Sequence, residues 1–267
     1  MPRRRHVAGW AAIAAALAAC GLSGCAYLPR EAAVPMPTRL IRSPCGAPAQ
    51  VLLVMLPGRG MSLDELEQQG FPAAVFAAGL AVDVLLVDAH AGYYKDRSIL
   101  ERLRLDVIAP ARAAGKTSIW LAGISLGGLG ALLYADAHPG DIDGVLVLAP
   151  YLGELDTAAA VARAGGLSQW RAPEAMPGPL PDDAIGLQAW RSAQGLVRPA
   201  ASAPRPPVFL GWGLSDRFAP AEQVLAEALP KARVFTAPGG HDWDPWLGLW
   251  RRMLAASGLP RCPGAPA

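Results

Sequence analysis

Strand-like apolar runs alternate with helix-like segments along most of this chain, and this alternation limits the folds that it can adopt. The apolar runs occupy residues 51–56, 82–87, 118–122, 144–148, 208–211 and 233–236. Continuous runs of this kind are typical of strands buried on both faces, which helices connect and cover. The pattern predicts an α/β fold with a mostly parallel sheet of about six strands flanked by helices.

Helix boundaries are marked between these runs. Ser62-Leu63-Asp64-Glu65 and Ser98-Ile99-Leu100-Glu101 have the pattern of capping boxes, and the second helix is expected to end at about Pro110. Residues 126–137 have the small, apolar character of a buried helix, and residues 243–254 are expected to form the closing helix.

The motif Gly123-Ile124-Ser125-Leu126-Gly127 lies between the third predicted strand and the helix that follows it. A G-x-S-x-G motif in that position predicts a nucleophile elbow, a tight strand-to-helix turn that exposes a serine. Glycines suit such a turn because neighbouring backbone passes close to it. Ser125 is therefore the predicted nucleophile.

A nucleophilic serine needs a base, and the base needs an acid that orients it. When such an elbow carries the serine, the acid follows it in the chain and the histidine comes last. Of the four histidines, only His241 follows both the serine and the candidate acids. Asp216 comes just after the fifth predicted strand and is the favoured acid. Glu154 is the alternative, whereas Asp242 is too close to His241 in sequence to orient its ring.

Two backbone amides should stabilise the negative charge that develops on a substrate oxygen. One is the N–H of Leu126, at the start of the helix. The other should come from the loop after the first strand, where Arg59 is best placed and Gly60 or Met61 are alternatives if the loop is displaced.

Together these residues resemble the α/β-hydrolase superfamily over roughly residues 50–256, and the segments Gly123–Gly130 and Gly240–Trp243 resemble its esterase branch, which includes esterase D. The resemblance implies an α/β-hydrolase fold and hydrolysis of carboxylic esters by a Ser-His-Asp triad, without cofactor or metal. Acyl transfer to another acceptor and a non-catalytic envelope lipoprotein are the alternatives. The chain departs from the family where Pro57-Gly58 replaces the usual His-Gly, and it has little sequence for the two strands that often begin the fold.

The segment 151–205, after the fourth predicted strand, contains no strand pattern. A strandless stretch of that length is unusual in a compact domain, so we expect a cap insertion over the active site. Within it, Trp170 and Trp190 form either an apolar acyl site or the insertion's own small core.

Residues that follow the second strand include Asp88, His90, Tyr93 and Tyr94. They are expected at the active-site edge, where they can line the pocket, but they are too sparse for a metal site. Gly115-Lys116-Thr117 resembles the end of a phosphate-binding loop, yet it precedes a strand instead of following one, so we reject that function.

Residues 1–24 predict an export signal, with arginines at positions 3–5 and an apolar run too short to span a membrane comfortably. Leu22-Ser23-Gly24-Cys25 resembles the lipobox of bacterial lipoproteins, which implies lipidation of Cys25, although Cys20 also fits the pattern. Ala26 follows Cys25 in place of the Asp that resembles an inner-membrane retention signal. We therefore expect a lipid anchor in the outer membrane, facing the periplasm.

If Cys25 carries the lipid, Cys45 and Cys262 remain as a pair in a compartment that permits disulfides. We expect them to form a disulfide that ties both ends to the core. Residues 25–48 would then be a Pro-rich tether and residues 49–262 the α/β-hydrolase domain.

Charge excludes nucleic acid as a partner. The chain has 24 Lys and Arg against 22 Asp and Glu, and loss of the signal with its three arginines leaves 21 basic residues. A nearly neutral mature chain has no electrostatic footprint for nucleic acid. The expected partners are a small-molecule or lipid ester and a membrane held through the N-terminal lipid, and we expect a monomer.

Overall fold

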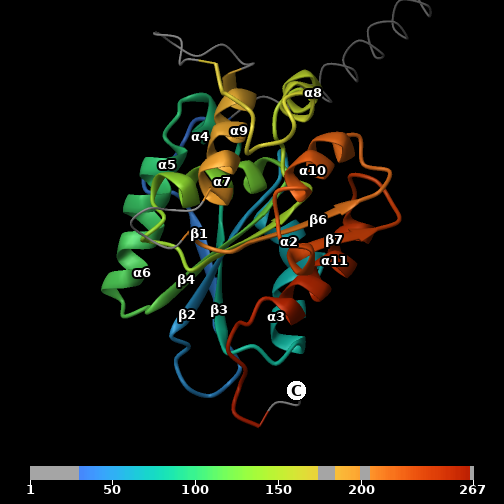
Figure 1. The fold of residues 1–267 in the computed structure, drawn as a ribbon. Helices are drawn as coiled ribbons and strands as arrows, with labels where there is room; N and C mark the ends of the chain where they lie inside the picture. Colours follow the sequence, from blue (N-terminus) through green and yellow to red (C-terminus); the bar gives the residue numbers. More distant parts are fainter. Residues whose placement is uncertain (1–29, 174–183, 199–204, 265–267) are drawn as a thin grey trace, which may run out of the picture.

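A seven-stranded sheet carries helices on both faces (Figure 1), in a computed structural model that describes residues 30–173, 184–198 and 205–264. The export signal at 1–24 and the lipidation candidates Cys20 and Cys25 lie outside the described residues.

The strands follow the order β1-β3-β2-β4-β5-β6-β7, and all neighbours are parallel except β1 and β3. Their bounds are β1 Thr38–Ile41, β2 Val51–Leu56, β3 Val82–Val87, β4 Ser118–Ile124, β5 Gly144–Leu148, β6 Val208–Gly213 and β7 Val234–Ala237. Every residue of β2, β5 and β6 is buried, because helices cover both faces of the sheet. The predicted α/β architecture is confirmed.

The additional strand, β1, comes from the segment that the sequence assigned to a tether. Its four residues pair with the last part of β3, so that Thr38 lies opposite Val87 and Ile41 opposite Val84. It is an exposed edge strand and lacks the apolar run that marked the other six. The sheet is therefore larger than the six strands expected, and residues 38–41 are not a free spacer.

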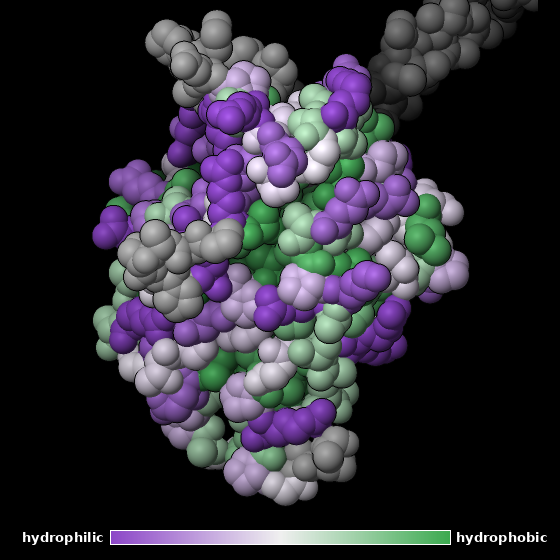
Figure 2. Space-filling view, in the orientation of Figure 1, coloured by the Kyte–Doolittle hydropathy of each residue, from purple (hydrophilic) through white to green (hydrophobic). Residues whose placement is uncertain are grey.

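The helices are α2 Leu63–Gln68, α3 Phe71–Ala77, α4 Ala91–Lys95, α5 Ile99–Arg102, α6 Ala109–Ala113, α7 Leu126–Ala137, α8 Leu155–Arg163, α9 Ala184–Val197, α10 Ala219–Ala226 and α11 Trp243–Ala256, with a π-helical turn η2 Leu103–Ile108 and a 3-10 turn η3 Lys231–Arg233. α3 packs with α11 on one side of the sheet, and α7 packs with α9 on the other (Figure 1). In the same orientation, Figure 2 shows hydrophobic residues exposed among polar ones below α8 and beside α10. Within the described ranges, no helix is both long and apolar enough to cross a bilayer.

The two expected capping boxes differ in outcome. Ser62 forms one at the start of α2, as predicted. Ser98 makes no such bond, because its hydroxyl donates to the Asp96 carboxylate at 2.6 Å. The helix also does not end at Pro110: the π-helical turn η2 leads without a break into α6, which contains Pro110 and ends at Ala113.

The described part of the predicted insertion forms α8 and α9, which pack on α10 and α7. Trp170 and Trp190 are buried there, and the Gln194 amide donates to the carbonyls of Leu167 (2.6 Å) and Trp170 (2.7 Å). Both indoles belong to the packed interior, which favours the small-core alternative over an acyl site. The insertion's segments 174–183 and 199–204 lie outside the described residues.

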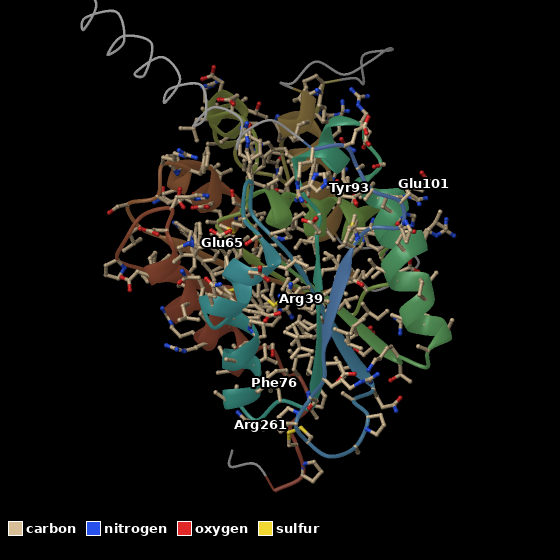
Figure 3. The ribbon with its side chains drawn as sticks, turned by 180° about the vertical axis from the view of Figure 1, so that it is seen from behind. Arg39, Glu65, Phe76, Tyr93, Glu101 and Arg261 are labelled. Carbon is tan, nitrogen blue, oxygen red and sulfur yellow. A yellow bond between two sulfur atoms is a disulfide. The ribbon has the colours of Figure 1, made fainter. Side chains whose placement is uncertain are left out.

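The amino ends of the strands are tied together by covalent and ionic contacts. Cys45 and Cys262 form the expected disulfide, with Cα atoms 5.3 Å apart. Nearby, Lys116 pairs with the buried carboxylate of Asp83 at 2.6 Å. This lysine, part of the segment that resembled a phosphate-binding loop, therefore has a structural role. In Figure 3 the disulfide lies beside Arg261, at the end of the molecule opposite Tyr93.

Candidate active site

Ser125 occupies the turn between β4 and α7 in a conformation that side chains other than glycine rarely adopt (φ 51°, ψ −111°). Its backbone N–H donates to Leu148 at 2.9 Å, and its carbonyl accepts from the N–H of Tyr151 at 2.9 Å. These bonds to β5 and the loop after it hold a strained turn in place, as a nucleophile elbow requires. The side chain stays partly exposed.

The glycines of the motif are needed because other backbone passes close to them. A Cβ on Gly123 would collide with the backbone of Gly127, and a Cβ on Gly127 would collide with the carbonyl of Leu56. A Cβ on Gly128 would lie 2.9 Å from Cα of Pro150. The first turn of α7 is therefore pressed against the end of β2 and against the loop after β5.

Asp216 and His241 are in direct contact. Asp216 follows β6, His241 follows β7, and the Asp216 carboxylate lies 2.7 Å from Nδ1 of the imidazole. The second carboxylate oxygen accepts the backbone N–H of Phe218 at 2.8 Å, and the aspartate side chain is fully buried. A carboxylate fixed in this way keeps the proton on Nδ1 and leaves Nε2 as the acceptor.

Aromatic rings fix the imidazole from two sides. The rings of Phe218 and Trp246 meet it edge to face, with centroids 5.3 Å and 4.8 Å away. Phe218 also packs against Tyr151 at 5.5 Å, and the backbone of Tyr151 is bonded to Ser125. Phe218 and Tyr151 were not among the predicted site residues, because their only signal in the sequence is that each follows a strand and lies close to a candidate site residue.

Ser125, Asp216 and His241 all lie at the edge where the parallel strands end, here called the carboxyl edge. Neighbouring strands are about 4.8 Å apart, so the ends of β4 and β7 are about 14 Å apart and the loops must bridge that distance. Among the described residues, no hydrogen bond joins the Ser125 hydroxyl to the His241 imidazole. The structure thus brings the predicted acid and base together and places the predicted nucleophile at the same edge, without a hydrogen bond between nucleophile and base.

The two competing acids make other contacts. Glu154 is exposed and accepts the Tyr151 hydroxyl at 3.2 Å. Asp242 caps α11 by accepting the backbone N–H of Trp243 at 2.7 Å. Neither is bonded to His241, so Asp216 alone has the position that an orienting acid needs.

The loop after β2 limits which amides could contact a substrate oxygen. The N–H of Met61 donates to the Gly58 carbonyl at 3.1 Å, and the N–H of Gly58 points to the Met61 sulfur at 3.1 Å. Among the described residues, the amides of Arg59 and Gly60 have no acceptor, so both are left for a ligand. Leu126 is the first residue of α7, and its N–H has no acceptor within the helix.

Residues predicted to line the pocket after β3 instead hold the N-terminal segment. Asp88 pairs with Arg30 at 2.8 Å, and the Tyr93 hydroxyl donates to the carbonyl of Ala33 at 2.8 Å. His90 caps α4 by accepting the N–H of Gly92 at 3.1 Å. In the described part of the chain, no three His, Cys, Asp or Glu side chains lie close enough together to hold a metal ion.

Glu222 is an unexpected carboxyl group beside the acid. It lies in α10, is completely buried, and neither carboxyl oxygen has a hydrogen-bond partner among the described residues. Burial, and secondly the charge of Asp216, raises the pKa of Glu222 to about 9. It is therefore neutral at pH 7 and does not add a second negative charge beside His241. The sequence carries no signal for this, because a glutamate in a helix is normally solvated.

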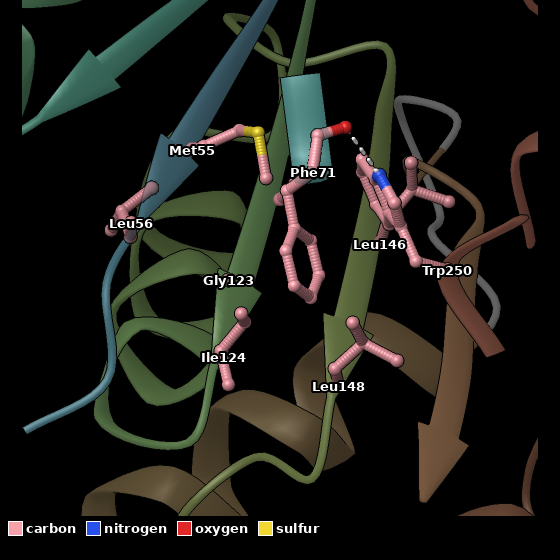
Figure 4. Close-up of a pocket in the computed structure, with 9 residues that line it drawn as sticks. Met55, Leu56, Phe71, Gly123, Ile124, Leu146, Leu148 and Trp250 are labelled. Atoms are coloured by element: carbon pink, nitrogen blue, oxygen red, sulfur yellow. Dashed lines mark hydrogen bonds between the residues drawn. The ribbon is translucent and has the colours of Figure 1, made fainter. Parts of the chain in front are cut away.

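Behind the elbow, the interior is packed with apolar side chains (Figure 4). Residues from β2, α3, β4, β5 and α11 line this region, and they are Met55, Leu56, Phe71, Ala122, Gly123, Ile124, Leu146, Leu148 and Trp250. The only polar contact drawn is the indole N–H of Trp250 donating to the Phe71 carbonyl at 3.0 Å. This packing supports the strand ends from which the site residues project.

Comparisons with known proteins point to one family. A family model described as "Putative esterase" matches residues 93–256, which is more than half of the chain. A search of curated proteins finds no match.

Three solved structures are similar at low sequence identity. They are Est1E from Butyrivibrio proteoclasticus with ferulic acid bound (TM-score 0.56, 20% identity, 82% of this chain and 92% of that chain), S-formylglutathione hydrolase FrmB from Staphylococcus aureus (0.55, 13%, 85% and 98%) and a hydrolase from Pseudomonas aeruginosa PA01 (0.53, 19%, 84% and 94%). At these identities the likeness shows the fold alone.

Proposed function

This chain belongs to the Esterase family and has the α/β-hydrolase fold, and we propose that it cleaves carboxylic esters through an acyl-enzyme on Ser125. The observation that carries the proposal is the 2.7 Å contact between the buried Asp216 carboxylate and His241, at the same sheet edge as the strained turn of Ser125. A binding protein would have no use for this arrangement.

In the first half-reaction, the Ser125 oxygen attacks the carbonyl carbon of the ester, and its proton passes to Nε2 of His241. The Asp216 carboxylate stabilises the imidazolium that results and holds its ring in place. The imidazolium then gives its proton to the leaving alcohol as the C–O bond breaks, which leaves the acyl group on Ser125.

In the second half-reaction, His241 removes a proton from a water molecule as that water attacks the acyl carbon. The imidazolium then returns the proton to the Ser125 oxygen as its bond to the acyl carbon breaks, which releases the acid and restores the free serine. The negative charge on the carbonyl oxygen in both steps is stabilised by the N–H of Leu126 and by the N–H of Arg59 or its neighbour Gly60. The N-terminal end of α7 adds a partial positive charge at the same place.

The mechanism requires the Ser125 hydroxyl and the His241 imidazole to come into hydrogen-bonding distance when substrate binds. Catalytic hydrogen bonds are often long before substrate binds and shorten in the complex. Rotation of the Ser125 side chain provides the movement, because Asp216, Phe218 and Trp246 hold the imidazole in place.

Turnover of soluble p-nitrophenyl esters tests the proposal. Wild-type protein should release p-nitrophenol from acetate or butyrate esters, and Ser125→Ala protein should lose at least about 10⁴-fold of this activity. Equal activity in the two proteins, or none in folded wild-type protein with any short or medium ester, would exclude the proposed function.

We further propose export and lipidation at Cys25, with anchoring in the outer membrane on its periplasmic side. The lipobox-like sequence before this cysteine supports lipidation. The disulfide between Cys45 and Cys262 supports a compartment outside the cytoplasm, since the cytoplasm keeps most thiols reduced. Metabolic labelling with a palmitate analogue, lost in a Cys25→Ala variant and retained in Cys20→Ala, tests this assignment.

A further inference from the structure

The N-terminal segment of the described chain is fixed to the carboxyl edge of the sheet. β1 runs antiparallel to β3, so the residues before Thr38 lie beyond the end of β3. Four polar contacts hold them there. The Asp88 N–H donates to the Pro37 carbonyl at 2.9 Å, and the Met36 N–H donates to the Asp106 carboxylate at 2.8 Å. Tyr93 bonds Ala33, and Asp88 pairs with Arg30. Figure 3 shows Tyr93 at this end of the molecule, opposite the disulfide end near Arg261.

The chain therefore passes Arg30 at the same edge that carries Ser125, Asp216 and His241. The backbone of Arg30 lies against α4, since a Cβ on Gly92 would collide with its carbonyl. Arg30 follows Cys25 by only five residues, and five extended residues span at most about 17 Å. A lipid on Cys25 would thus hold the carboxyl edge close to the bilayer, whereas the disulfide end would point away.

Exposed hydrophobic side chains occur along the same edge. Among the described residues, five large hydrophobic side chains are exposed, and three of them lie at this edge. Val34 (69% exposed) precedes β1, Leu155 (40%) comes after β5 and Leu214 (55%) directly follows β6. Leu214 lies two residues before Asp216, and Leu155 lies four residues after Tyr151. The three are spread from the β3 side of the edge to the β6 side, about 19 Å at the spacing of strands.

Charge does not single out this edge. Arg217 and Asp242 are both exposed beside the site, so the edge carries both signs. What distinguishes this edge is its solvent-exposed apolar side chains, together with an N-terminal segment that reaches Cys25 within five residues of Arg30. Such side chains gain free energy by entering the acyl region of a bilayer.

We infer that the carboxyl edge of the sheet lies against the membrane surface, and that the enzyme takes its esters from the bilayer as membrane-resident lipid esters with long acyl chains. The inference rests on the proposed function and names its substrate class. Val34, Leu155 and Leu214 enter the bilayer surface, and Ser125 faces the lipid esters held there.

Orientation can be measured without catalysis. The lipidated full-length chain is reconstituted in vesicles of phosphatidylethanolamine and phosphatidylglycerol, with a nitrobenzoxadiazole dye attached at Leu214→Cys or, as a control, at Ala256→Cys. Ala256 is an exposed residue at the last position of α11, and the chain continues from it to Cys262 at the disulfide end. The dye at position 214 should shift to shorter wavelength and brighten on the vesicles, and the dye at position 256 should not.

Substrate class is measured with two fluorogenic esters in the same vesicles. Leu155→Ser with Leu214→Ser should cleave embedded 4-methylumbelliferyl palmitate about tenfold more slowly than wild type, while cleavage of soluble 4-methylumbelliferyl acetate stays within about twofold. Leu40→Ser is the matched control and should leave both rates unchanged, because Leu40 is exposed to a similar extent (44%) but lies within β1, opposite Leu85. All variants should float with the vesicles, because the lipid holds them.

Failure of the inference and failure of the proposed function give different results. Equal dye spectra at positions 214 and 256, equal palmitate rates in the Leu155/Leu214 double variant and Leu40→Ser, or wild-type protein that does not float would each overturn the membrane orientation while acetate is still cleaved. If the dye shift is present but neither ester is cleaved by wild-type protein, the hydrolase function and its lipid substrate are excluded together.

Discussion

Asp216 and His241 meet at 2.7 Å although 24 residues and a complete α10–β7 unit separate them in the chain. Two neighbouring parallel strands bring them together, because β6 and β7 end at the same edge of the sheet. The imidazole is further fixed by the rings of Phe218 and Trp246. In the proposed mechanism, Asp216 holds the imidazole ring in place and stabilises the imidazolium.

Asp216→Asn should lower kcat for p-nitrophenyl esters by about 10³-fold or more, because the amide cannot hold the required tautomer or stabilise the imidazolium. KM should change little, since Asp216 is buried behind His241 and does not contact substrate. Steady-state kinetics with circular dichroism to confirm folding measures this effect.

The two competing candidate acids are controls for that variant. Glu154→Gln and Asp242→Asn should keep kcat within about threefold of wild type, because neither carboxylate is bonded to His241. A large loss in Glu154→Gln with little loss in Asp216→Asn would reassign the acid.

Gly127→Ala should unfold the elbow, because a methyl group there would collide with the carbonyl of Leu56. We expect a loss of about 3 kcal/mol in the free energy of unfolding, and loss of activity, measured by urea denaturation and ester turnover. Gly140→Ala is the matched control, since a Cβ at Gly140 meets no atom within 4 Å. Equal stability of the two variants would contradict the close approach of α7 to the end of β2.

Much of the fold could be predicted because buried parallel strands leave a strong sequence signal. The runs at β2, β3 and β5 have the observed bounds, and the helix of the elbow, α7, was also correct. β1 could not be found in this way, since an exposed edge strand has no apolar run. The end of the helix near Pro110 was misjudged because the π-helical turn η2, which the sequence does not mark, leads directly into α6.

Glu222→Gln should make the protein more stable at alkaline pH. The pKa of Glu222 is about 9 in the folded chain, against 4.5 without burial, so the contribution of this carboxyl is complete below pH 4.5 and is lost as the pH rises through about 9. The stability difference between variant and wild type should therefore grow from pH 5 to pH 9, reaching a few kcal/mol.

Denaturation in urea at several pH values measures this difference. A gap between Glu222→Gln and wild type that stays constant over that range would mean that Glu222 is ionised in the folded protein. Activity at pH 7 should be nearly the same in both, because the side chain is neutral in each.

Replacing Cys45 and Cys262 by serine should lower the stability by about 2 to 5 kcal/mol, since the disulfide closes a loop of 217 residues. Thermal unfolding should show the loss, and treating wild-type protein with a reductant should reproduce it. Ester turnover at low temperature should persist, because the disulfide lies at the end opposite the site. An unchanged Tm in both experiments would show that the bond is absent or contributes nothing.

The chemistry of the site was easier to predict than its surroundings. Ser125 and His241 follow from a local motif and from elimination among four histidines, and Asp216 follows from its place after a strand. Phe218, Tyr151 and Glu222 carry no comparable signal, because their roles depend on which loops meet in three dimensions. The N-terminal contacts of Tyr93 and Asp88 depend equally on the position of β1.

The most direct test of the central claim is covalent capture of the nucleophile. Folded wild-type protein treated with a fluorophosphonate should gain the mass of one adduct, and peptide mapping should find it on Ser125. Ser125→Ala should gain none, and Asp216→Asn should react much more slowly. An adduct on another residue, or no adduct on wild-type protein that is folded, would contradict the account.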